Sequence, residues 1–412
     1  MKKLIYTIVV LLIIHCTFNI ENCQAQWVQM SNGMPIDQNI QSFASNPSYL
    51  FAGLKVDFTN TKGVYRSSNN GNGWDQTALT SYDIYSIATS GNYLFAGTND
   101  NGIYRSTDNG TTFTQVSTIT GDVCLAISGS YIFAGNTGAT GGVYLSTNNG
   151  NSWTKTSLIS YCVKCIAING SYIFAGTKNC VGGYGVYRST NNGTNWTLTS
   201  LNNQEIRSLA ISGSNIFAGT QLNGVYLSTN NGNTWTQTSL NTEWITSLII
   251  SGTNIFAGTD NGNFFHSTDN GTTWIPRNEG LPTVRSIYSL LISNSYIFLG
   301  TGGNSVWRRP TSEIIGIQNI STEIPSSFSL SQNYPNPFNP TTNIRFDLPR
   351  SGSVKLVVFD ALGREVATLV NEKLAPGTYE VDWNGSEYPS GVYFYRIQAG
   401  DFVETKKMLL VM

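Results

Sequence analysis

Two short phrases that repeat along most of the chain constrain its fold more than any other feature of the sequence. The first is Phe-Ala-Gly, whose six copies end at Gly53, Gly97, Gly135, Gly176, Gly219 and Gly258. The second, Ser-x-(Asn/Asp)-Asn-Gly-x-x-(Trp/Phe), follows each copy, and its aromatic recurs every 39 to 43 residues, at Trp74, Phe113, Trp153, Trp196, Trp235 and Trp274. This period is that of a four-stranded propeller blade, which takes about 40–45 residues.

The two ends of the repeat array indicate how a ring would close. A seventh, altered copy, Phe298-Leu299-Gly300, continues to Arg309 and stops before a fourth strand. Residues 26–31, in contrast, read like an isolated fourth strand, similar to residues 234–239. Pairing that strand with residues 304–309 would remove two exposed sheet edges. We therefore predict an all-β chain in which residues 26–310 form a seven-bladed β-propeller closed by its N-terminal strand.

Composition supports a chain of many short strands. Charged residues make up 11% of the chain, against roughly 25% in an average soluble protein. Beyond the N-terminus, no stretch sustains the apolar period of a helix. The formal net charge is −1, so no strong field would attract nucleic acid, and no nucleic-acid partner is predicted.

The first residues read as a secretory signal. Lys2 and Lys3 form a basic start, Leu4 to Ile14 an apolar core, and the small residues before Gln26 a cleavage site after Ala25. The apolar run is shorter than the about 20 residues of a spanning helix. We expect residues 1–25 to be a cleaved signal peptide and the mature protein to have no transmembrane segment.

The second phrase resembles the Asp-box, or BNR repeat, of sialidase-type families, as in Ser106-Thr107-Asp108-Asn109-Gly110. Similar propellers occur in photosystem-assembly factors, sortilin-like receptors and some glycosidases, so the resemblance implies a fold rather than an activity. We expect the third residue of each phrase to be structural, with its side-chain oxygen accepting hydrogen bonds within the turn. These residues are Asn69, Asp108, Asn148, Asn191, Asn230 and Asp269. Arg66, Arg105 and Arg188 share one third-strand position, which predicts surface residues spread around the rim.

A ligand site is expected on the face opposite the Asp-box turns. The residues that precede the small inner-strand residue of each blade should ring one level of the central channel: Gln41, Tyr85, Val123, Lys164, Arg207, Thr246 and Tyr288. Our hypothesis is a polar, aromatic-lined site for a carbohydrate or peptide, formed by Tyr85, Lys164, Arg207, Tyr288, Trp244 and Arg285. The alternative is that these side chains only line the channel.

Four cysteines follow the predicted signal peptide, and an exported chain permits disulfides. Cys162 opens the inner strand of blade four and Cys180 lies in that blade's long loop on the same face, so we predict a Cys162–Cys180 disulfide. Cys124 and Cys165 occupy equivalent inner positions in neighbouring blades and should be small buried residues. No second cysteine pair or histidine accompanies them, so no metal site is predicted.

The repeat ends after Arg309, and a polar linker, residues 311–327, leads to a different module. In residues 328–412, a proline-rich lead-in is followed by alternating strands at 343–348, 353–359 and 391–399. About 80 residues of this pattern predict a small antiparallel Ig/fibronectin-like β-sandwich.

This module closely resembles the type A C-terminal sorting domain of the type IX secretion system. The resemblance rests on the Asn-Tyr-Pro-Asn-Pro-Phe-Asn-Pro lead-in, on residues 360–363 and 390–395, and on the ending Thr405 to Met408. The matching positions include Asn336, Pro337, Asn339, Pro340, Gly391, Tyr393, Lys406 and Lys407. It implies export to the periplasm, recognition by the type IX translocon and sorting machinery, and display on the outer surface or secretion. The alternative is a fibronectin-like binding module.

Three functions remain open from the sequence. The first is a non-catalytic binding, adhesion or scaffold propeller at the cell surface, with no cofactor. The second is an extracellular glycoside hydrolase of sialidase-like type, which would need an arginine triad and paired acidic residues that the sequence does not display. The third is an assembly chaperone for a surface complex. A histidine-based triad in the mature chain would depend on His266 alone.

Overall fold

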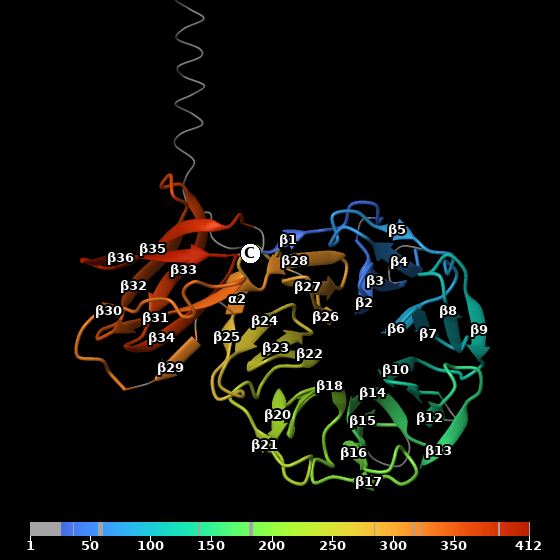
Figure 1. Ribbon diagram of the computed structural model, residues 1–412. Helices are drawn as coiled ribbons and strands as arrows, with labels where there is room; N and C mark the ends of the chain where they lie inside the picture. The colour runs from blue at the N-terminus through green and yellow to red at the C-terminus, as the bar shows by residue number, and fades with distance from the viewer. Residues whose placement is uncertain are drawn as a thin grey trace, which may run out of the picture.

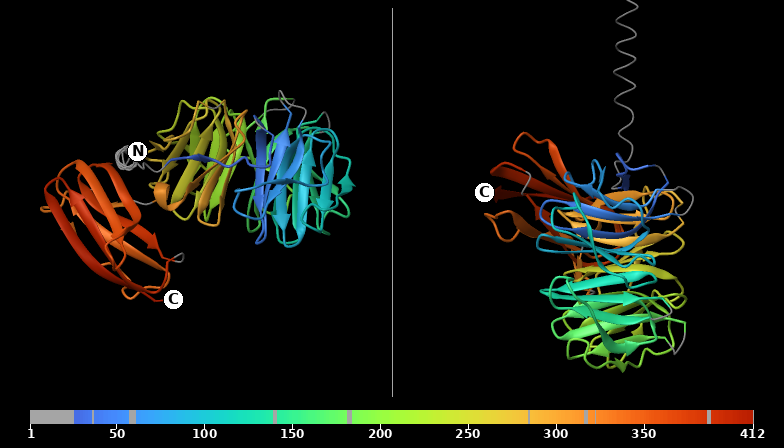
Figure 2. Two further views of the ribbon diagram at one scale, coloured as in Figure 1. Left: turned by 90° about the horizontal axis from the view of Figure 1, so that it is seen from above. Right: turned by 90° about the vertical axis from the view of Figure 1, so that its right-hand side faces the viewer.

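The computed structural model describes residues 26–411 except 36, 57–60, 139–140, 181–183, 284, 316–317, 322 and 386–387, so the predicted signal peptide lies outside the described residues. Seven four-stranded sheets surround a common axis (Figure 1), and two further sheets form a C-terminal unit beside the ring, seen apart from it in the left-hand view of Figure 2. The predicted all-β architecture of a seven-bladed propeller followed by a sandwich is confirmed.

The first six blades follow the order of the chain, each with its first strand innermost. Blades one and two contain β2 (Asn39–Ser45), β3 (Leu50–Lys55), β4 (Gly63–Ser67), β5 (Asp75–Gln76), β6 (Ile84–Ser90), β7 (Tyr93–Thr98), β8 (Ile103–Ser106) and β9 (Thr114–Ser117). Blades three and four contain β10 (Val123–Ser128), β11 (Tyr131–Asn136), β12 (Gly142–Ser146), β13 (Thr154–Ile159), β14 (Cys162–Asn169), β15 (Tyr172–Lys178), β16 (Val186–Ser189) and β17 (Thr197–Leu198). Blades five and six contain β18 (Ile206–Ser212), β19 (Asn215–Thr220), β20 (Val225–Ser228), β21 (Thr236–Gln237), β22 (Ile245–Ser251), β23 (Asn254–Thr259), β24 (Phe264–Ser267) and β25 (Ile275–Pro276).

Blade seven joins the two ends of the array. It contains β26 (Ile287–Ser293), β27 (Tyr296–Thr301), β28 (Val306–Pro310) and, as its fourth strand, β1 (Val28–Gln29). Val28 pairs with Arg308 and Gln29 with Trp307, as the sequence predicted. Trp27 is buried beside this strand, and its indole nitrogen donates to the carbonyl of Arg277 at 2.7 Å. The N-terminal strand therefore closes the ring.

The Phe-Ala-Gly phrase brings neighbouring blades into close contact. It lies on the second strand of each blade, where the phenylalanine and the alanine are buried. The glycine faces the inner strand of the next blade: a Cβ added to Gly53 would lie 2.5 Å from Cγ2 of Ile84. Only glycine permits this approach, because a real Cβ would have to displace the isoleucine.

Four arginines on third strands also connect neighbouring blades. Arg66 donates to the carbonyl of Asn109 at 2.7 Å, and Arg105 donates to that of Asn149 at 2.6 Å. The same bond joins Arg188 to Asn231 and Arg308 to Asn70. These arginines are spread around the ring, but the expectation of a plain surface role was wrong, because each is half-buried and bonded to the Asp-box turn of the next blade.

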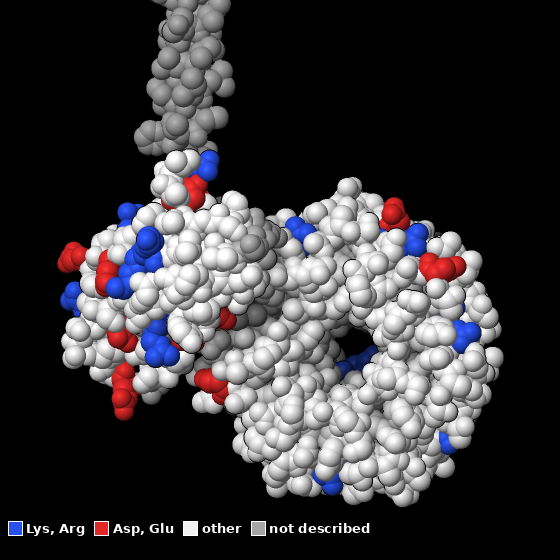
Figure 3. All heavy atoms as spheres, viewed as in Figure 1, with Lys and Arg blue, Asp and Glu red and all other residues white. Residues whose placement is uncertain are grey.

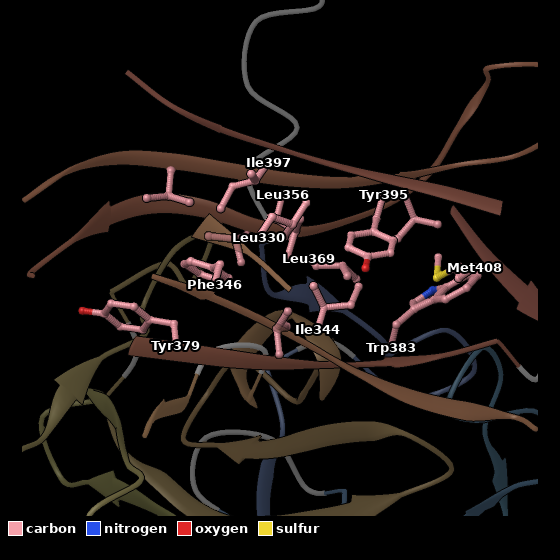
Figure 4. Close-up of a cluster of buried hydrophobic side chains, with 14 of the residues drawn as sticks. Leu330, Ile344, Phe346, Leu356, Leu369, Tyr379, Trp383, Tyr395, Ile397 and Met408 are labelled. Carbon is pink, nitrogen blue, oxygen red and sulfur yellow. The ribbon is translucent and has the colours of Figure 1, made fainter. Parts of the chain in front are cut away.

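The C-terminal unit is a two-sheet sandwich. One sheet contains β29 (Gln318–Ser321), β30 (Ser329–Leu330), β31 (Thr341–Leu348) and β34 (Gly377–Asn384), and the other contains β32 (Gly352–Phe359), β33 (Glu365–Leu374), β35 (Gly391–Ala399) and β36 (Phe402–Leu410). Side chains of both sheets fill the core between them, among them Phe346, Leu356 and Ile397 (Figure 4).

The segment predicted as a linker has structure of its own. It contains the helix α2 (Ser312–Ile315), whose Ile314 packs into the core of blade seven, and β29, which pairs with β34 of the sandwich. Part of residues 311–327 thus belongs to each neighbouring unit. Within the described residues, no helix has the length and apolar character needed to cross a membrane.

Candidate functional site at the mouth of the channel

The residues predicted to ring the channel coincide with irregularities in the inner strands. In six blades the pairing of the first two strands skips one residue, which bulges out of the ladder. The bulged residues are Gln41, Tyr85, Lys164, Arg207, Thr246 and Tyr288. A bulge redirects the side chain of the extra residue and is common beside binding sites. The repeat thus presents six variable side chains at one level.

Blade three departs from this pattern, and the expectation for Val123 was wrong. Its inner strand pairs without a skip, with Val123 opposite Asn136 and Cys124 opposite Gly135. Val123 is fully buried and would touch a side chain at Gly97, as Ile84 would at Gly53. Blade three therefore lacks the bulged residue. The preceding residue, Asp122, acts electrostatically on both Tyr85 and Lys164 and so lies near them.

The first cluster of the site is centred on the ring of Tyr85. The ammonium groups of Lys55 and Lys164 lie 4.9 Å and 5.3 Å from the centre of this ring. Both distances are within the range of a cation–π contact. Three elements contribute to the cluster: Lys55 ends β3, Tyr85 is on β6, and Lys164 is on β14.

The two lysines differ in their electrostatic surroundings. Burial lowers the pKa of Lys164; Asp122 opposes this effect, whereas Arg207 and Lys178 add to it. Burial also acts against the charge of Lys55, but the Tyr85 hydroxyl, Asp122 and Tyr288 outweigh it and raise the pKa of Lys55. A space-filling view shows basic side chains inside the central opening, whereas the other charged side chains visible on the ring lie toward its outer edge (Figure 3).

The second cluster is centred on Arg207, in the blade next to Lys164. Its guanidinium carbon lies 5.1 Å from the centre of the Trp244 ring, and its Nη2 donates to Gln221 Oε1 at 2.6 Å. Glu205 is 3.9 Å from the same nitrogen. Arg207 Nε and Trp244 Nε1 are buried with no hydrogen-bond partner among the described residues. This cluster thus contains two buried N–H donors that have no partner among the described residues.

Tyr288 and Arg285 lie at a third place on the rim. A Cβ added to Gly302 would meet the Tyr288 ring at 3.1 Å and the Cβ of Arg285 at 3.5 Å, so both residues border the same loop. Tyr288 acts electrostatically on Lys55 and is part of the first cluster's surroundings. Arg285 is exposed.

The sequence analysis missed three residues at the mouth of the channel, although all three occupy the same position in the repeat. Lys55, Lys178 and Gln221 each stand two residues after the glycine of a Phe-Ala-Gly phrase. In the structure this position is at or just after the end of the second strand, opposite the residue that stands two before the bulged one. A second variable position per blade therefore borders the channel beside the first.

A disulfide joins Cys162 to Cys180, with their Cα atoms 6.0 Å apart. It ties the start of β14, two residues before Lys164, to the loop after β15. Cys124 and Cys165 are free thiols, and burial raises the pKa of each. Among the described residues, no group of three histidine, cysteine, aspartate or glutamate side chains is placed to hold a metal ion.

Three carboxylates on this face accept hydrogen bonds from neighbouring loops. Asp83 accepts from the amide of Val56, and Glu205 accepts from the amide of Asn179. Glu243 accepts from the side chain of Asn261. Burial, followed by the charge of Arg277, lowers the pKa of His266 to about 3. Its ring stacks on Phe256 at 4.8 Å and bonds to Asn254, so it is a neutral structural residue.

In the Asp-box turns, the side-chain oxygen bonds within its own turn. In the first turn, Asn69 Oδ1 accepts from the amide of Gly73 and from the hydroxyl of Ser67, both at 2.9 Å. The equivalent amide bond is made by Asp108, Asn148, Asn191, Asn230 and Asp269. Hydrogen bonds from Thr112 and Ser106 lower the pKa of Asp108 to about 2.

The proline-rich lead-in lies along the last strand of the sandwich. Asn336 Oδ1 accepts from the amide of Leu409, and Phe338 exchanges backbone bonds with residues 409 and 411. Pro337, Asn339 and Pro340 flank the buried Phe338. The remaining motif residues lie on the neighbouring strands β35 and β36: Gly391, Tyr393, Lys406 and Lys407. The motif residues thus lie on, or beside, the last two strands of the sandwich.

Comparisons with known families identify both parts of the chain. The family described as "Secretion system C-terminal sorting domain" matches residues 332–411. The family described as "DUF6242 beta propeller domain" matches residues 160–298. A search of the curated proteins finds no match to the chain.

Several solved structures share the propeller fold. YCF48 from Cyanidioschyzon merolae is 15% identical with a TM-score of 0.55, and the match covers 69% of this chain and 98% of that one. A structure titled "YCF48 bound to D1 peptide" is 14% identical with the same TM-score, over 71% and 98% of the two chains.

A third similar structure is PorZ, described as an essential bacterial surface component of the type-IX secretion system of Porphyromonas gingivalis. It is 13% identical with a TM-score of 0.55, and the match covers 93% of this chain but 61% of PorZ. At these identities the likeness concerns the fold. The two family matches identify the chain as a β-propeller that carries a type IX C-terminal sorting domain and is exported to the cell surface or secreted.

Proposed function

We propose that the mature chain is a non-catalytic binding protein at the outer cell surface, and that the mouth of its channel holds a ligand with an acidic group. The observation that carries this proposal is a pair of cations on adjacent inner strands, Lys164 over Tyr85 and Arg207 over Trp244. Each is directed by a bulge to the same level of the channel.

The chemistry of the mouth favours a carboxylate-bearing peptide or carbohydrate. Among the charged groups of the two clusters, the cations Lys55, Lys164, Lys178 and Arg207 outnumber the carboxylates Asp122 and Glu205, which favours a ligand with negative charge. The aromatic faces offer flat surfaces to sugar rings or aliphatic side chains. That a propeller of the same fold has been solved with a peptide, YCF48 with D1, supports the peptide as ligand.

The delivery of this propeller forms the second part of the proposal. Residues 1–25 would be the cleaved signal peptide, 26–310 the cargo and 328–412 the module that the type IX translocon and sorting machinery recognise. Deletion of residues 328–412 should leave the propeller in the periplasm. Surface display of the truncated chain would contradict this assignment.

Binding can be tested with the purified mature chain on peptide and glycan arrays. Lys164→Met and Arg207→Gln should each weaken the best hits at least tenfold. The matched control is Lys155→Met, because Lys155 also stacks on a tyrosine, 5.4 Å from the Tyr144 ring, but lies on an outer strand. Equal binding by all variants would exclude the mouth. Release of chromophore from a panel of chromogenic glycosides would instead establish a glycosidase.

A further inference from the structure

Three of the arginines that connect blades occupy the same kind of binding site, which we call the seat. It consists of two groups. The first group is a tyrosine near the start of the second strand, and the second is the backbone carbonyl in the Asp-box turn of the next blade. Arg66 lies 5.2 Å from the ring centre of Tyr49, and Arg105 lies 5.6 Å from that of Tyr93. Arg308 lies 4.3 Å from that of Tyr296. Each arginine donates to the turn carbonyl at the same time.

Blade three keeps this seat but lacks the arginine. Tyr131 occupies the tyrosine position, and Asn192, with a φ of 53°, occupies the turn position in blade four. Leu145 stands where the arginine would be, because it pairs with Phe133 as Arg105 pairs with Phe95. Tyr131 is 38% exposed, whereas the tyrosines that carry an arginine are half-buried.

A pocket lies at this junction between blades three and four. Its volume is about 390 Å³, and both Tyr131 and Asn192 line it. Phe133 and Ile168 form apolar walls, and the small residues of two hairpins, 128–130 and 170–171, form its rim. The volume is within the range of ligand pockets, about 300–1,000 Å³. The pocket is therefore large enough for a side chain to enter from outside.

Blade five also lacks the arginine, but it does not retain the rest of the seat. Leu227 also replaces an arginine there, but the tyrosine is replaced too, by Asn215. The Asn215 side chain instead reaches Asn270 Oδ1 at 3.4 Å and so bridges to the next turn itself. Within the described blades, the third is the one that combines an uncovered tyrosine, an adjacent turn and a pocket.

We propose that the seat on blade three binds an arginine side chain of a partner polypeptide, on the face that carries the Asp-box turns. The three arginines in such seats, Arg66, Arg105 and Arg308, show which chemistry these groups accept. A guanidinium can stack on an aromatic face and donate to a carbonyl at once, which an ammonium does less well. This site is on the opposite face from the channel mouth and does not depend on the function proposed for it.

The experiment titrates the mature full-length chain with N-acetyl-arginine methylamide, followed by NMR. The matched probe is the citrulline analogue, which has nearly the same shape but no charge. Leu145→Arg fills the seat with the protein's own guanidinium, so it should weaken binding at least tenfold and raise the melting temperature of the propeller. Leu227→Arg is the matched control and should leave binding unchanged.

Tyr131→Leu provides a second variant that leaves the backbone of the seat intact, and it should weaken binding at least fivefold. The proposal is overturned if the arginine and citrulline probes bind equally. It is also overturned if Leu145→Arg or Tyr131→Leu binds the arginine probe as the parent chain does, or if the parent chain shows no saturable binding.

Discussion

Replacing Trp27 by alanine tests the closure of the ring. Trp27 is 3% exposed, meets Phe264 edge-on at 5.0 Å and donates its indole N–H to Arg277. Burial of roughly 200 Å² of aromatic surface corresponds to about 5 kcal/mol at about 25 cal/mol per Å². Measured Trp→Ala changes in cores cost about 3–5 kcal/mol. We expect the free energy of unfolding of the propeller to fall by about 4 kcal/mol.

The matched control is Val28→Ala on the same strand. Val28 is 55% exposed, so its truncation should change stability by about 0.5 kcal/mol or less. Calorimetry and guanidinium unfolding followed by circular dichroism would measure both variants, with the sandwich transition as an internal reference. If Trp27→Ala is within about 1 kcal/mol of Val28→Ala, the first strand does not hold the ring closed.

Three further predictions concern other contacts. Arg105→Leu should lower the free energy of unfolding by about 1–2 kcal/mol. Arg105→Lys should recover only part of this loss, because lysine cannot stack on the tyrosine and donate to the carbonyl together. Equal stability of the lysine variant and the parent would contradict this. Replacing Cys162 and Cys180 by serine should cost about 3 kcal/mol, since the bond closes a separation of 18 residues, and unchanged guanidinium unfolding would contradict it. His266 is neutral when folded, with a pKa of about 3 against 6.5 for the free side chain. As the pH drops below about 6.5, His266 binds a proton in the unfolded chain but not in the folded one, so the free energy of unfolding falls. His266→Asn should therefore lose less stability than the parent chain between pH 7 and pH 5, and an equal loss would contradict the reasoning.

The ring and its closure could be predicted because both depend on repetition along the chain. Residues 26–31 copy a fourth strand that the seventh repeat lacks, and no other copy needs one. Aligning the inner strands of the repeats also predicted, for six blades, which side chain lies at the mouth of the channel. It failed at Val123 because blade three is one residue shorter there, and position counting assumes copies of equal length.

Contacts between blades were harder to predict, because they join residues that no single repeat contains. Arg105 reads as a surface residue within its own blade, and only the neighbouring turn shows why it is half-buried. Lys55 was missed for a similar reason, since its partner Tyr85 is in the next blade. The strand β29 was missed because its partner, β34, lies far along the chain.

The seam in blade seven has a consequence for the order of synthesis. The side chain of Gln29 donates to the carbonyl of Asn304, which is 275 residues later in the chain. The first strand of the propeller therefore cannot pair until β28, its last strand, has been made. Contacts between such distant residues form late in folding. Until β28 has been made, β1 has no strand to pair with and blade seven is an incomplete sheet. Closure of the ring therefore reports that synthesis has passed residue 310, before the sandwich is complete.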